Sequence, residues 1–400
     1  MTDSRILVLG GGINQIAVAK EARQRGALVI VTDSNENPPA KVVADYFYQV
    51  DTTKKAENLR IAKHHQISAV VTDQSDAALP TAAYVAAEMN LPGIPPRIAE
   101  VFTNKFLMRK ILSKNSSPYQ PSYFEKFTQK PKALNFLNKF AGNLDCFIVK
   151  PVDSQGSKGV SRLSESDSTE QIERAFHESR SGAIIIEEFV PGEEFSVDSV
   201  VVDSNVTCLA IGRKEHYATN NCLDQRIVFL GSYLDEYRGS LVRANQEILA
   251  QLGLRTGLAH AEFIVTENRI LLVEAAARGG GAGISSIIAP HISDFDSTKF
   301  LLDSATGTRH IKVEAPTTQN RSAILHFFNP NVGLLTGVEV GDAAKLLCSE
   351  FHLNTSRLTL GAEPRDSRSR IGHFVVLGES YPQTLARESA VLEAVVFKHE

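Results

Sequence analysis

The first hundred residues alternate short apolar runs with polar, helix-like segments, and this alternation limits the possible folds more than any other feature. Three runs rich in Val and Ile, residues 5–10, 27–33 and 67–73, are predicted to be strands, and residues 13–25 are predicted to form a helix. Continuous apolar strands separated by helices are typical of a parallel sheet that is covered on both faces. The sequence therefore predicts a Rossmann-like α/β unit that ends at the Pro- and Gly-rich segment 91–96.

Charge and composition exclude several classes of protein. The 400 residues include 42 Lys and Arg against 46 Asp and Glu, a formal net charge of −4, which gives no electrostatic reason to expect nucleic acid as a partner. No apolar run approaches the roughly 20 residues of a membrane-spanning helix, and the N-terminus lacks a signal-peptide pattern. The 4 cysteines are widely spaced, without a C-x-x-C pair, and are predicted to be reduced thiols. We expect a cytoplasmic protein that does not bind a membrane.

A glycine turn after the first strand invites comparison with dinucleotide-binding proteins. Gly10, Gly11 and Gly12 precede a helix, and Asp33 closes the second strand, as in the motif that binds the ribose of NAD. Gln15 stands where the third glycine of that motif belongs. An NAD-dependent oxidoreductase is therefore the less favoured interpretation, and a tight strand-to-helix turn is the simpler one.

The remainder of the chain contains further predicted elements. A helix is expected over 103–114, with Thr103 as its N-cap, and a turn-rich linker over 115–122. Beyond the linker we predict strands over 146–152 and 183–190, helices over 168–179 and 241–254, an antiparallel pair of strands over 194–212 and a hairpin over 257–277. The C-terminal part is predicted to be mixed, with strands near 322–328 and 372–378.

Two motifs suit phosphate binding. Lys150 ends an apolar strand, and a loop of small residues follows it, namely Ser154, Gly156, Ser157, Lys158 and Gly159. Small residues let backbone N–H groups approach phosphate oxygens, and a lysine supplies a point charge. Lys105 lies on the earlier helix. Taken alone, a glycine loop after a strand is more often a simple turn.

Carboxylates mark two other places. Glu187 and Glu188 end an apolar strand just before a Pro-Gly turn, which a solvated strand end would also explain. Glu262 and Glu274 are expected on one face of the hairpin 257–277, where they would repel each other unless a cation lay between them. Carboxylate oxygens suit Mg²⁺, and Mn²⁺ is an alternative. Two surface carboxylates on a half-exposed hairpin remain an equal possibility on the hairpin alone.

In their order along the chain, these pieces resemble the ATP-grasp superfamily, which includes biotin carboxylase and bacterial L-amino-acid ligases. The resemblance covers roughly 1–310 and implies an α/β ATP-grasp fold with an N-terminal Rossmann-like domain and a C-terminal α+β portion. It implies four parts: a Rossmann-like domain over 1–114, a lid subdomain over 115–190, a catalytic subdomain over 191–310 and an α+β subdomain over 311–400.

The resemblance also implies roles for single residues. Lys105 and Lys150 would contact the phosphates of ATP beneath a flap formed by residues 154–159, and Lys150, Lys158 and Arg278 would act as catalytic residues by neutralising charge. Glu187 or Glu188, with the Val190 backbone, would contact adenine, and Glu194 the ribose. Glu262 and Glu274 would hold Mg²⁺. The remaining residues of the implied nucleotide site are Ser154, Gly156, Ser157 and Gly159.

One departure from the family pattern bears on the metal and on the substrate. Many members have Asn two residues after the second metal-binding glutamate, where this chain has Ala276, so the number of metal ions stays open. The "EAAAR" version is similar to bacterial ligases that make dipeptides.

Family chemistry would convert a small carboxylate into an acyl phosphate and join it to an amine, with release of ADP. A carboxylation or purine-biosynthesis enzyme and a non-catalytic nucleotide-binding protein are the alternatives, and a homodimer is a common assembly in the family.

The sequence does not identify the substrate pair. Residues 213–226 are expected to form a polar loop in which Arg213, Lys214, His216 and Arg226 are candidate binders of carboxylate or phosphate. The arginine-rich segment 363–374 either covers the same cleft or is plain surface.

Overall fold

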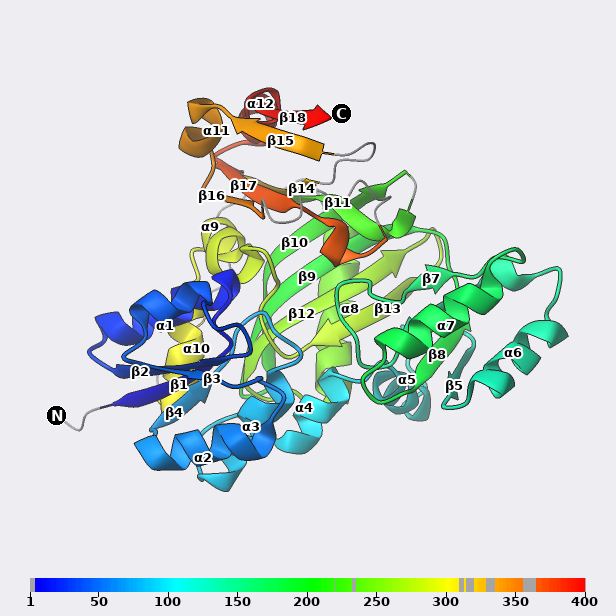
Figure 1. Ribbon diagram of the computed structural model, residues 1–400. Coiled ribbons are helices and arrows are strands. Elements are labelled where there is room, and N and C mark those ends of the chain that lie inside the picture. Colours follow the sequence, from blue (N-terminus) through cyan, green and yellow to red (C-terminus); the bar gives the residue numbers. More distant parts are fainter. Residues whose placement is uncertain are drawn as a thin grey trace.

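The protein is described by a computed structural model that covers residues 4–218, 220–231, 235–308, 313, 320–328, 335–354 and 365–399. Within these residues the strands form an eight-stranded sheet, two four-stranded sheets and one two-stranded sheet. Figure 1 shows the N-terminal unit and the smaller sheet of the lid on opposite sides of the large central sheet, with the C-terminal elements at its far edge.

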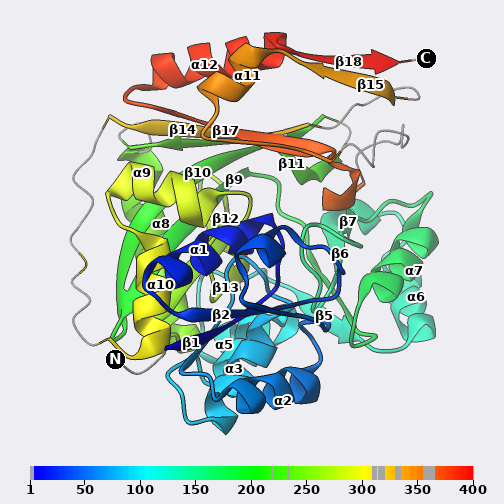
Figure 2. The same cartoon turned by 60° about the vertical axis from the view of Figure 1, so that its left-hand side comes forward.

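The N-terminal sheet is parallel and has the order β3-β2-β1-β4. Its strands are β1 (Arg5–Leu9), β2 (Leu28–Asp33), β3 (Tyr46–Gln49) and β4 (Ala69–Val71). Each strand presents apolar residues to both faces, so both faces need cover. The helices α1 (Ile16–Gln24) and α10 (Ser297–Thr306) cover one face, and α2 (Lys55–His65) and α3 (Leu79–Glu88) cover the other. Figure 2 shows α10 beside α1 although the two are far apart in sequence.

The lid is an antiparallel sheet in the order β5-β8-β6-β7 with two helices packed on it. It comprises β5 (Phe124–Phe127), α6 (Lys130–Lys139), β6 (Phe147–Pro151), β7 (Ser161–Arg162), α7 (Ser168–Glu178) and β8 (Ile184–Glu188). The aromatic rings of Tyr123, Phe136 and Phe147 pack together under the helices. This packing buries one face of the lid and leaves the other to face the central sheet.

The central sheet has the order β13-β12-β9-β10-β11-β14-β17-β16. Its strands are β9 (Glu193–Val202), β10 (Asn205–Tyr217), β11 (Asn220–Leu230), β12 (Gly257–Val265), β13 (Ile270–Ala276), β14 (Ser322–Phe328), β16 (Glu350–Leu353) and β17 (Gly372–Gly378). Alternation along β9 sends Phe195 and Val197 to the face covered by α4 (Pro96–Phe102), α5 (Lys105–Lys114) and α8 (Asp235–Leu252). The same alternation leaves Glu194 and Asp198 on the opposite face, where the polar side chains gather.

The C-terminal part extends the central sheet, because β14, β17 and β16 pair onto it next to β11. A two-stranded sheet of β15 (Leu335–Val340) and β18 (Val395–His399) packs above it with α11 (Asp342–Leu347) and α12 (Tyr381–Glu393). On the other side, η4 (Ile284–Ile288) and α9 (Ala289–Ser293) join β13 to α10.

Two local predictions were wrong. Residues 213–217 and 220–226 belong to β10 and β11 and do not form a loop. They are polar because this end of the sheet lines a cavity, and residue 219 lies outside the described residues. The N-cap of α5 is Asn104, whose side chain accepts the Leu107 N–H at 3.2 Å, and Thr103 instead ends α4. The expected strands 322–328 and 372–378 match β14 and β17.

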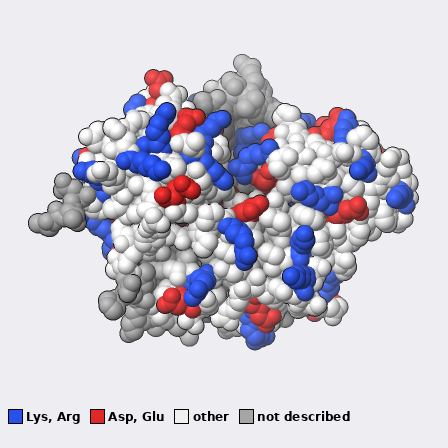
Figure 3. Space-filling model, turned by 90° about the horizontal axis from the view of Figure 1, so that it is seen from below, with Lys and Arg blue, Asp and Glu red and all other residues white. Residues whose placement is uncertain are grey.

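Among the helices that the structure describes, none is both long enough and apolar enough to cross a bilayer. On the face seen in Figure 3, basic and acidic side chains are interspersed, in keeping with the small net charge.

Candidate functional site

A cavity lies between the lid sheet and the central sheet, and most of the predicted nucleotide-site residues line it. Lys105, Lys150, Ser154, Gly156, Ser157, Glu187, Glu188, Val190, Glu194, Glu262 and Glu274 all contribute. Its remaining walls include the apolar side chains Ile148, Phe189, Ile264 and Leu271. An apolar slot flanked by carboxylates and lysines can accept a flat base at one end and anionic groups at the other.

Glu187 links the lid to the helix α5 in a fully buried ion-pair network. Its carboxylate accepts Lys150 Nζ at 2.6 Å and Arg109 Nε at 2.9 Å, and Arg109 also donates to the Val273 carbonyl at 2.7 Å. Burial alone would raise the pKa of Glu187, but the positive charges of Arg109 and Lys150 outweigh it and lower the pKa to about 2. Lys150 is therefore held in place by a partner on its own sheet.

Glu188 points elsewhere. Its carboxylate accepts the backbone N–H of Ser122 at 2.6 Å and pairs with Arg269 at 3.1 Å. Glu188 thereby ties the linker before β5 to the hairpin of β12 and β13, although part of it also lines the cavity.

Glu262 and Glu274 are directly opposite each other in the β12–β13 register. In this structure Glu274 pairs with Lys105 at 2.6 Å, and Glu262 pairs with Lys214 at 2.9 Å. Burial would raise the pKa of Glu262, but the charges of Lys214 and His260 lower it well below its usual range. Two opposed carboxylates that each pair with a cation form an oxygen donor set suited to Mg²⁺.

Lys214 is the centre of a second charged cluster on the same face. Its ammonium lies 2.5 Å from Glu194, 3.1 Å from Asp224 and 2.9 Å from Glu262. Burial works against its charge, but the three carboxylates raise the pKa of Lys214 well above its usual value. Glu194, His216 and Asp224 could by their spacing hold a metal ion, but the Lys214 ammonium already neutralises this group.

His260 lies directly opposite Ala276 in the β12–β13 pair. Its Nδ1 is 3.0 Å from Asp198 Oδ2, and its Nε2 is 3.5 Å from Glu262 Oε1. Burial opposes the charged imidazole, but the Asp198 and Glu262 carboxylates raise the pKa of His260 to about 10. A polar side chain thus stands across from the position where many family members have Asn.

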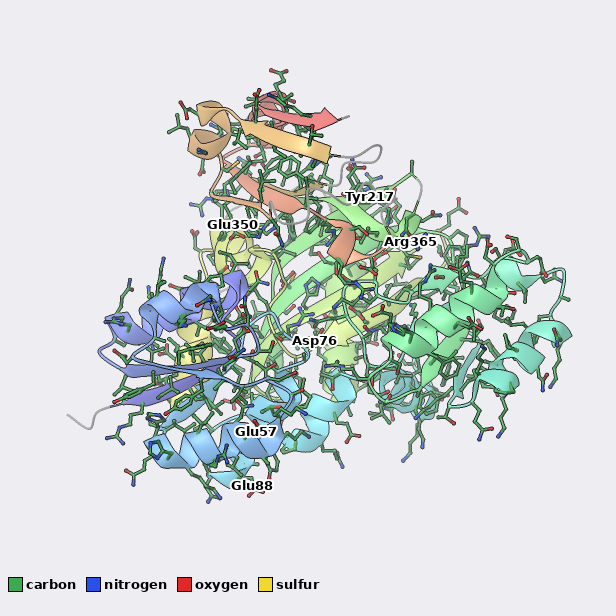
Figure 4. All side chains as sticks on the ribbon, in the orientation of Figure 1. Glu57, Asp76, Glu88, Tyr217, Glu350 and Arg365 are labelled. Carbon is green, nitrogen blue, oxygen red and sulfur yellow. The ribbon has the colours of Figure 1, made fainter. Side chains whose placement is uncertain are left out.

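Arg278 follows β13 and pairs with Asp76 of the N-terminal unit. Both contacts between the guanidinium and the carboxylate measure 2.7 Å, and Arg278 also donates to the Gly279 carbonyl at 2.9 Å. Asp76, labelled in Figure 4, lies where the N-terminal unit meets the central sheet. Arg278 does not line the cavity described above, but it borders a second one with Thr72.

The glycine loop 153–160 is held over the cavity from two sides. Asp76 N–H donates to Gln155 Oε1 at 3.1 Å, and Ser367 N–H donates to the Gly156 carbonyl at 3.1 Å. Lys105 Nζ donates to the Ser154 carbonyl at 2.8 Å. Lys158 and Gly159 do not line the cavity, and the charge of Lys158 instead acts on Asp366.

The described part of the arginine-rich segment, residues 365–374, contacts the glycine loop and the lid beside this cleft without lining the cavity, and residues 363 and 364 lie outside the described residues. Arg368 pairs with Glu178 of α7 at 2.7 Å, and the Arg370 guanidinium stacks over Phe327 beside Asp224. Figure 4 shows Arg365 between the C-terminal part and the lid.

Of the four candidate binders in 213–226, Lys214 and His216 face the cluster, whereas Arg213 pairs with Glu193 and Arg226 with Glu388.

Sequence reasoning missed four residues around the site: Arg109, Asp76, Asp198 and His260. A signal existed for Arg109, which is one helical turn after Lys105, and for His260, which shares a strand face with Glu262. Asp76 and Asp198 come close only through the tertiary fold.

The nicotinamide alternative loses support from the glycine turn. Asp33, which would bind a ribose, accepts the Gly11 N–H at 2.7 Å and the Asn35 N–H at 2.8 Å. Gln15 fills the space beside Gly10 and donates to the Asp73 carbonyl at 2.6 Å. Asp33 and Gln15 thus both form hydrogen bonds within the chain at the positions where a dinucleotide would bind.

Comparison with known proteins agrees with this geometry. Residues 145–286 match the family model of the ATP-grasp domain. The chain is 23% identical over 358 residues to phosphoribosylamine–glycine ligase of Methanococcus vannielii, with 82% of this chain and 78% of that protein covered. It is 27% identical over 305 residues to formate-dependent phosphoribosylglycinamide formyltransferase of Prochlorococcus marinus, with 73% and 74% covered.

Among solved structures, L-amino acid ligase from Bacillus licheniformis superposes with a TM-score of 0.80 at 19% identity, with 99% of each chain covered. The match extends over the N-terminal unit, the lid, the central sheet and the C-terminal part. Residues 145–286 therefore match the ATP-grasp domain, and the chain as a whole shares the fold of this L-amino acid ligase.

Proposed function

We propose that this protein is an ADP-forming ligase that uses ATP to activate a small carboxylate as an acyl phosphate and then joins it to an amine. The observation that carries the proposal is the cavity between the lid and the central sheet. There two lysines, the carboxylate Glu194 and the opposed pair Glu262 and Glu274 converge beneath a glycine loop.

The proposed roles follow the positions of the side chains. Lys105 and Lys150 bind phosphate oxygens, the slot beside Glu187, Glu188 and Val190 takes adenine, and Glu194 takes the ribose. Ser154, Gly156, Ser157 and Gly159 belong to the flap. Glu262 and Glu274 would hold Mg²⁺, which supplies charge neutralisation at the transferring phosphoryl group.

Arg278 and Lys158 are proposed as catalytic residues that offset developing negative charge. Arg278 carries a formal positive charge beside Asp76, and Glu274 and Glu262 also raise its pKa against the effect of burial. Water must be excluded during the reaction because an acyl phosphate hydrolyses, and the two-sided contacts of the flap support that role.

The domain division at 1–114, 115–190, 191–310 and 311–400 is part of this proposal, as is a homodimer. Light scattering of the purified chain tests the assembly.

The direct test is release of ADP and phosphate from ATP and Mg²⁺ with a panel of amino acids, singly and in pairs. We expect ADP release that depends on two substrates together. An arm with phosphoribosylamine and glycine tests the alternative suggested by the names of the sequence relatives. Release of AMP, or no nucleotide turnover in any arm, would contradict the proposal.

A further inference from the structure

The loop that follows β4 carries two buried hydrogen-bond acceptors that the protein leaves unused. Asp73 and Gln74 are only 3% and 7% exposed. Among the residues that the structure describes, neither Asp73 Oδ1 nor Gln74 Oε1 has a hydrogen-bond partner. Buried polar atoms are nearly always satisfied, so two orphaned acceptors on adjacent residues require an explanation.

The rest of each side chain is firmly held, so the two acceptors are directed by the fold. Gln74 Nε2 donates to Asp73 Oδ2 at 3.1 Å, and Gln15 Nε2 donates to the Asp73 carbonyl. Gln74 also has φ of +56°, a left-handed conformation that a non-glycine residue adopts at a cost. A strained and cross-linked loop indicates a built site.

The loop lies where ligands bind in open parallel sheets, outside the carboxyl ends of the strands. A cavity of about 220 Å³ adjoins it, bordered by Thr72 and Arg278. The other walls are mainly apolar and come from β4, α3, β12 and α10, including Val70, Ala83, Leu258, Leu301 and Ala305. Thr72 directly precedes Asp73 in the chain, so this cavity, which has room for an apolar group, begins one residue before the two acceptors, which do not themselves line it.

No cation of the chain satisfies Asp73. Arg278 is near enough for its charge to act on Asp73, but its guanidinium is occupied by Asp76 and by the Gly279 carbonyl. Burial raises the pKa of Asp73 to about 6 against the hydrogen bonds from Gln74 and the Gly279 backbone and the charge of Arg278, so the group is largely a carboxylate at neutral pH. A buried carboxylate and an adjacent amide oxygen together attract a positively charged donor.

We propose that Asp73 and Gln74 form the subsite for the primary ammonium group of the amine substrate, whose apolar substituent occupies the adjoining cavity. This inference rests on the proposed function, which requires an amine. An ammonium has three N–H donors and no acceptor, which complements two acceptors that lack donors. The proximity of Arg278 places this group next to the proposed reaction centre. The nitrogen must lose a proton before it attacks the acyl phosphate, and the Asp73 carboxylate is the group placed to accept that proton.

The test uses the full chain with ATP, Mg²⁺ and the panel of L-amino acids, with ADP release as the readout. Asp73→Asn keeps the shape of the side chain and removes its charge. We expect the KM for the amine substrate to rise about 10- to 100-fold, as for loss of a charge-assisted hydrogen bond, with the affinity for ADP–Mg²⁺ unchanged. Gln74→Met removes the amide oxygen and should raise the same KM by a smaller factor.

Asp51→Asn is the matched control, because Asp51 lies in the same N-terminal unit and its carboxylate caps the Thr53 N–H at 2.8 Å. It should leave the KM unchanged. Without substrate, Asp73→Asn should melt at the same temperature as the wild-type chain or higher, because a buried charge that no cation contacts is removed. A lower melting temperature would assign Asp73 a structural role and overturn the proposal.

Two further comparisons complete the design. With saturating carboxylate substrate present, N-acetylated amino acids, which lack the ammonium, should neither replace the amine substrate nor compete with it. Apolar amino acids should be better amine substrates than charged ones. If turnover is normal and Asp73→Asn leaves the amine KM unchanged, only the subsite is wrong. If no pair in the panel releases ADP, the proposed function fails and the subsite falls with it.

Discussion

Glu187 is the most deeply embedded charge of the nucleotide cavity, with its side chain 3% exposed between Arg109 and Lys150. Its two partners come from different elements, α5 and β6, so the carboxylate fastens the lid to the helix that carries Lys105. A network of this kind is sensitive to the loss of one member, because the remaining buried charges are left uncompensated.

Glu187→Gln should therefore lower the free energy of unfolding by about 3–5 kcal/mol. Glu188→Gln is the control, because Glu188 is half-buried and its pair with the more exposed Arg269 should contribute no more than about 1 kcal/mol. Urea unfolding of both variants at neutral pH measures the difference. Equal losses would show that burial of Glu187 contributes nothing particular to stability.

The raised pKa of Asp73 predicts that its contribution to stability changes with pH in the opposite direction from that of Glu187, whose pKa is lowered. Its folded-state pKa of about 6 exceeds the ordinary value of 3.8, so the folded chain binds the proton more tightly than the unfolded chain. Stability from this group is full at low pH and is lost as pH rises from about 4 to about 6, by on the order of 3 kcal/mol.

Asp73→Asn removes that loss. Its stability relative to the wild-type chain should grow as pH increases through this window and stay constant above about pH 7. Melting temperatures of both proteins across pH 4 to 8 provide the measurement. A difference that shrinks as the pH increases would mean that Asp73 is stabilised as an anion in the folded chain.

At the scale of the elements, the flap is held by contacts that local sequence does not reveal. Gly156 has φ of +67°, and a Cβ there would lie 2.4 Å from Ser367 Oγ. Gly142 has φ of +88°, but no atom lies within 4 Å of a Cβ built there. Gly142 therefore has the same left-handed backbone as Gly156 but no steric contact that a side chain would disturb.

Gly156→Ala should therefore differ from Gly142→Ala. Both substitutions cost about 1–2 kcal/mol through the left-handed backbone, but only the first also pushes the flap away from Ser367. We expect faster proteolytic nicking near Lys158 and a higher KM for ATP in Gly156→Ala alone, with nucleotide slowing the nicking in the wild-type chain. Equal nicking of the two variants would show that the contact with Ser367 does not restrain the flap.

Elements with a clear pattern were predicted correctly, and those shaped by the site were not. The apolar runs of β1 and β2 and the hairpin of β12 and β13 follow from periodicity, and the register brought Glu262 opposite Glu274 as expected. The end of β10 and the strand β11 were missed because they carry Lys214, His216 and Asp224 toward a charged cluster, which gives this part of the sequence the composition of a loop.

At the scale of the whole molecule, the site draws on units that are separate in sequence. Local motifs predicted the residues on the lid and the central sheet, because each is tied to one strand or one turn. The partners of Arg109 and Asp76 could not be assigned from sequence, because Glu187 and Arg278 are 78 and 202 residues away from them. The substrate cannot be predicted from local sequence for the same reason, because the walls of the cavity beside Arg278 come mainly from four separate elements.

Nucleotide binding between the lid and the central sheet should stabilise the whole molecule. ADP with Mg²⁺ at 100 times its Kd should add about 2.7 kcal/mol to the free energy of unfolding. NAD should add nothing, because Asp33 and Gln15 are occupied within the N-terminal unit. Thermal denaturation with each ligand tests this, and equal stabilisation by NAD would restore the oxidoreductase interpretation.

The central claim, that this cavity transfers a phosphoryl group from ATP to a carboxylate, is tested most directly by trapping the acyl phosphate. Hydroxylamine replaces the amine, and hydroxamate and ADP are measured together with ATP, Mg²⁺ and each carboxylate of the panel. We predict hydroxamate in equal amount to ADP for the wild-type chain. Glu274→Gln, which removes one of the two opposed carboxylates and the partner of Lys105, should lower both by a factor on the order of 10²–10⁴. Formation of AMP instead of ADP, or full hydroxamate formation by Glu274→Gln, would contradict the account.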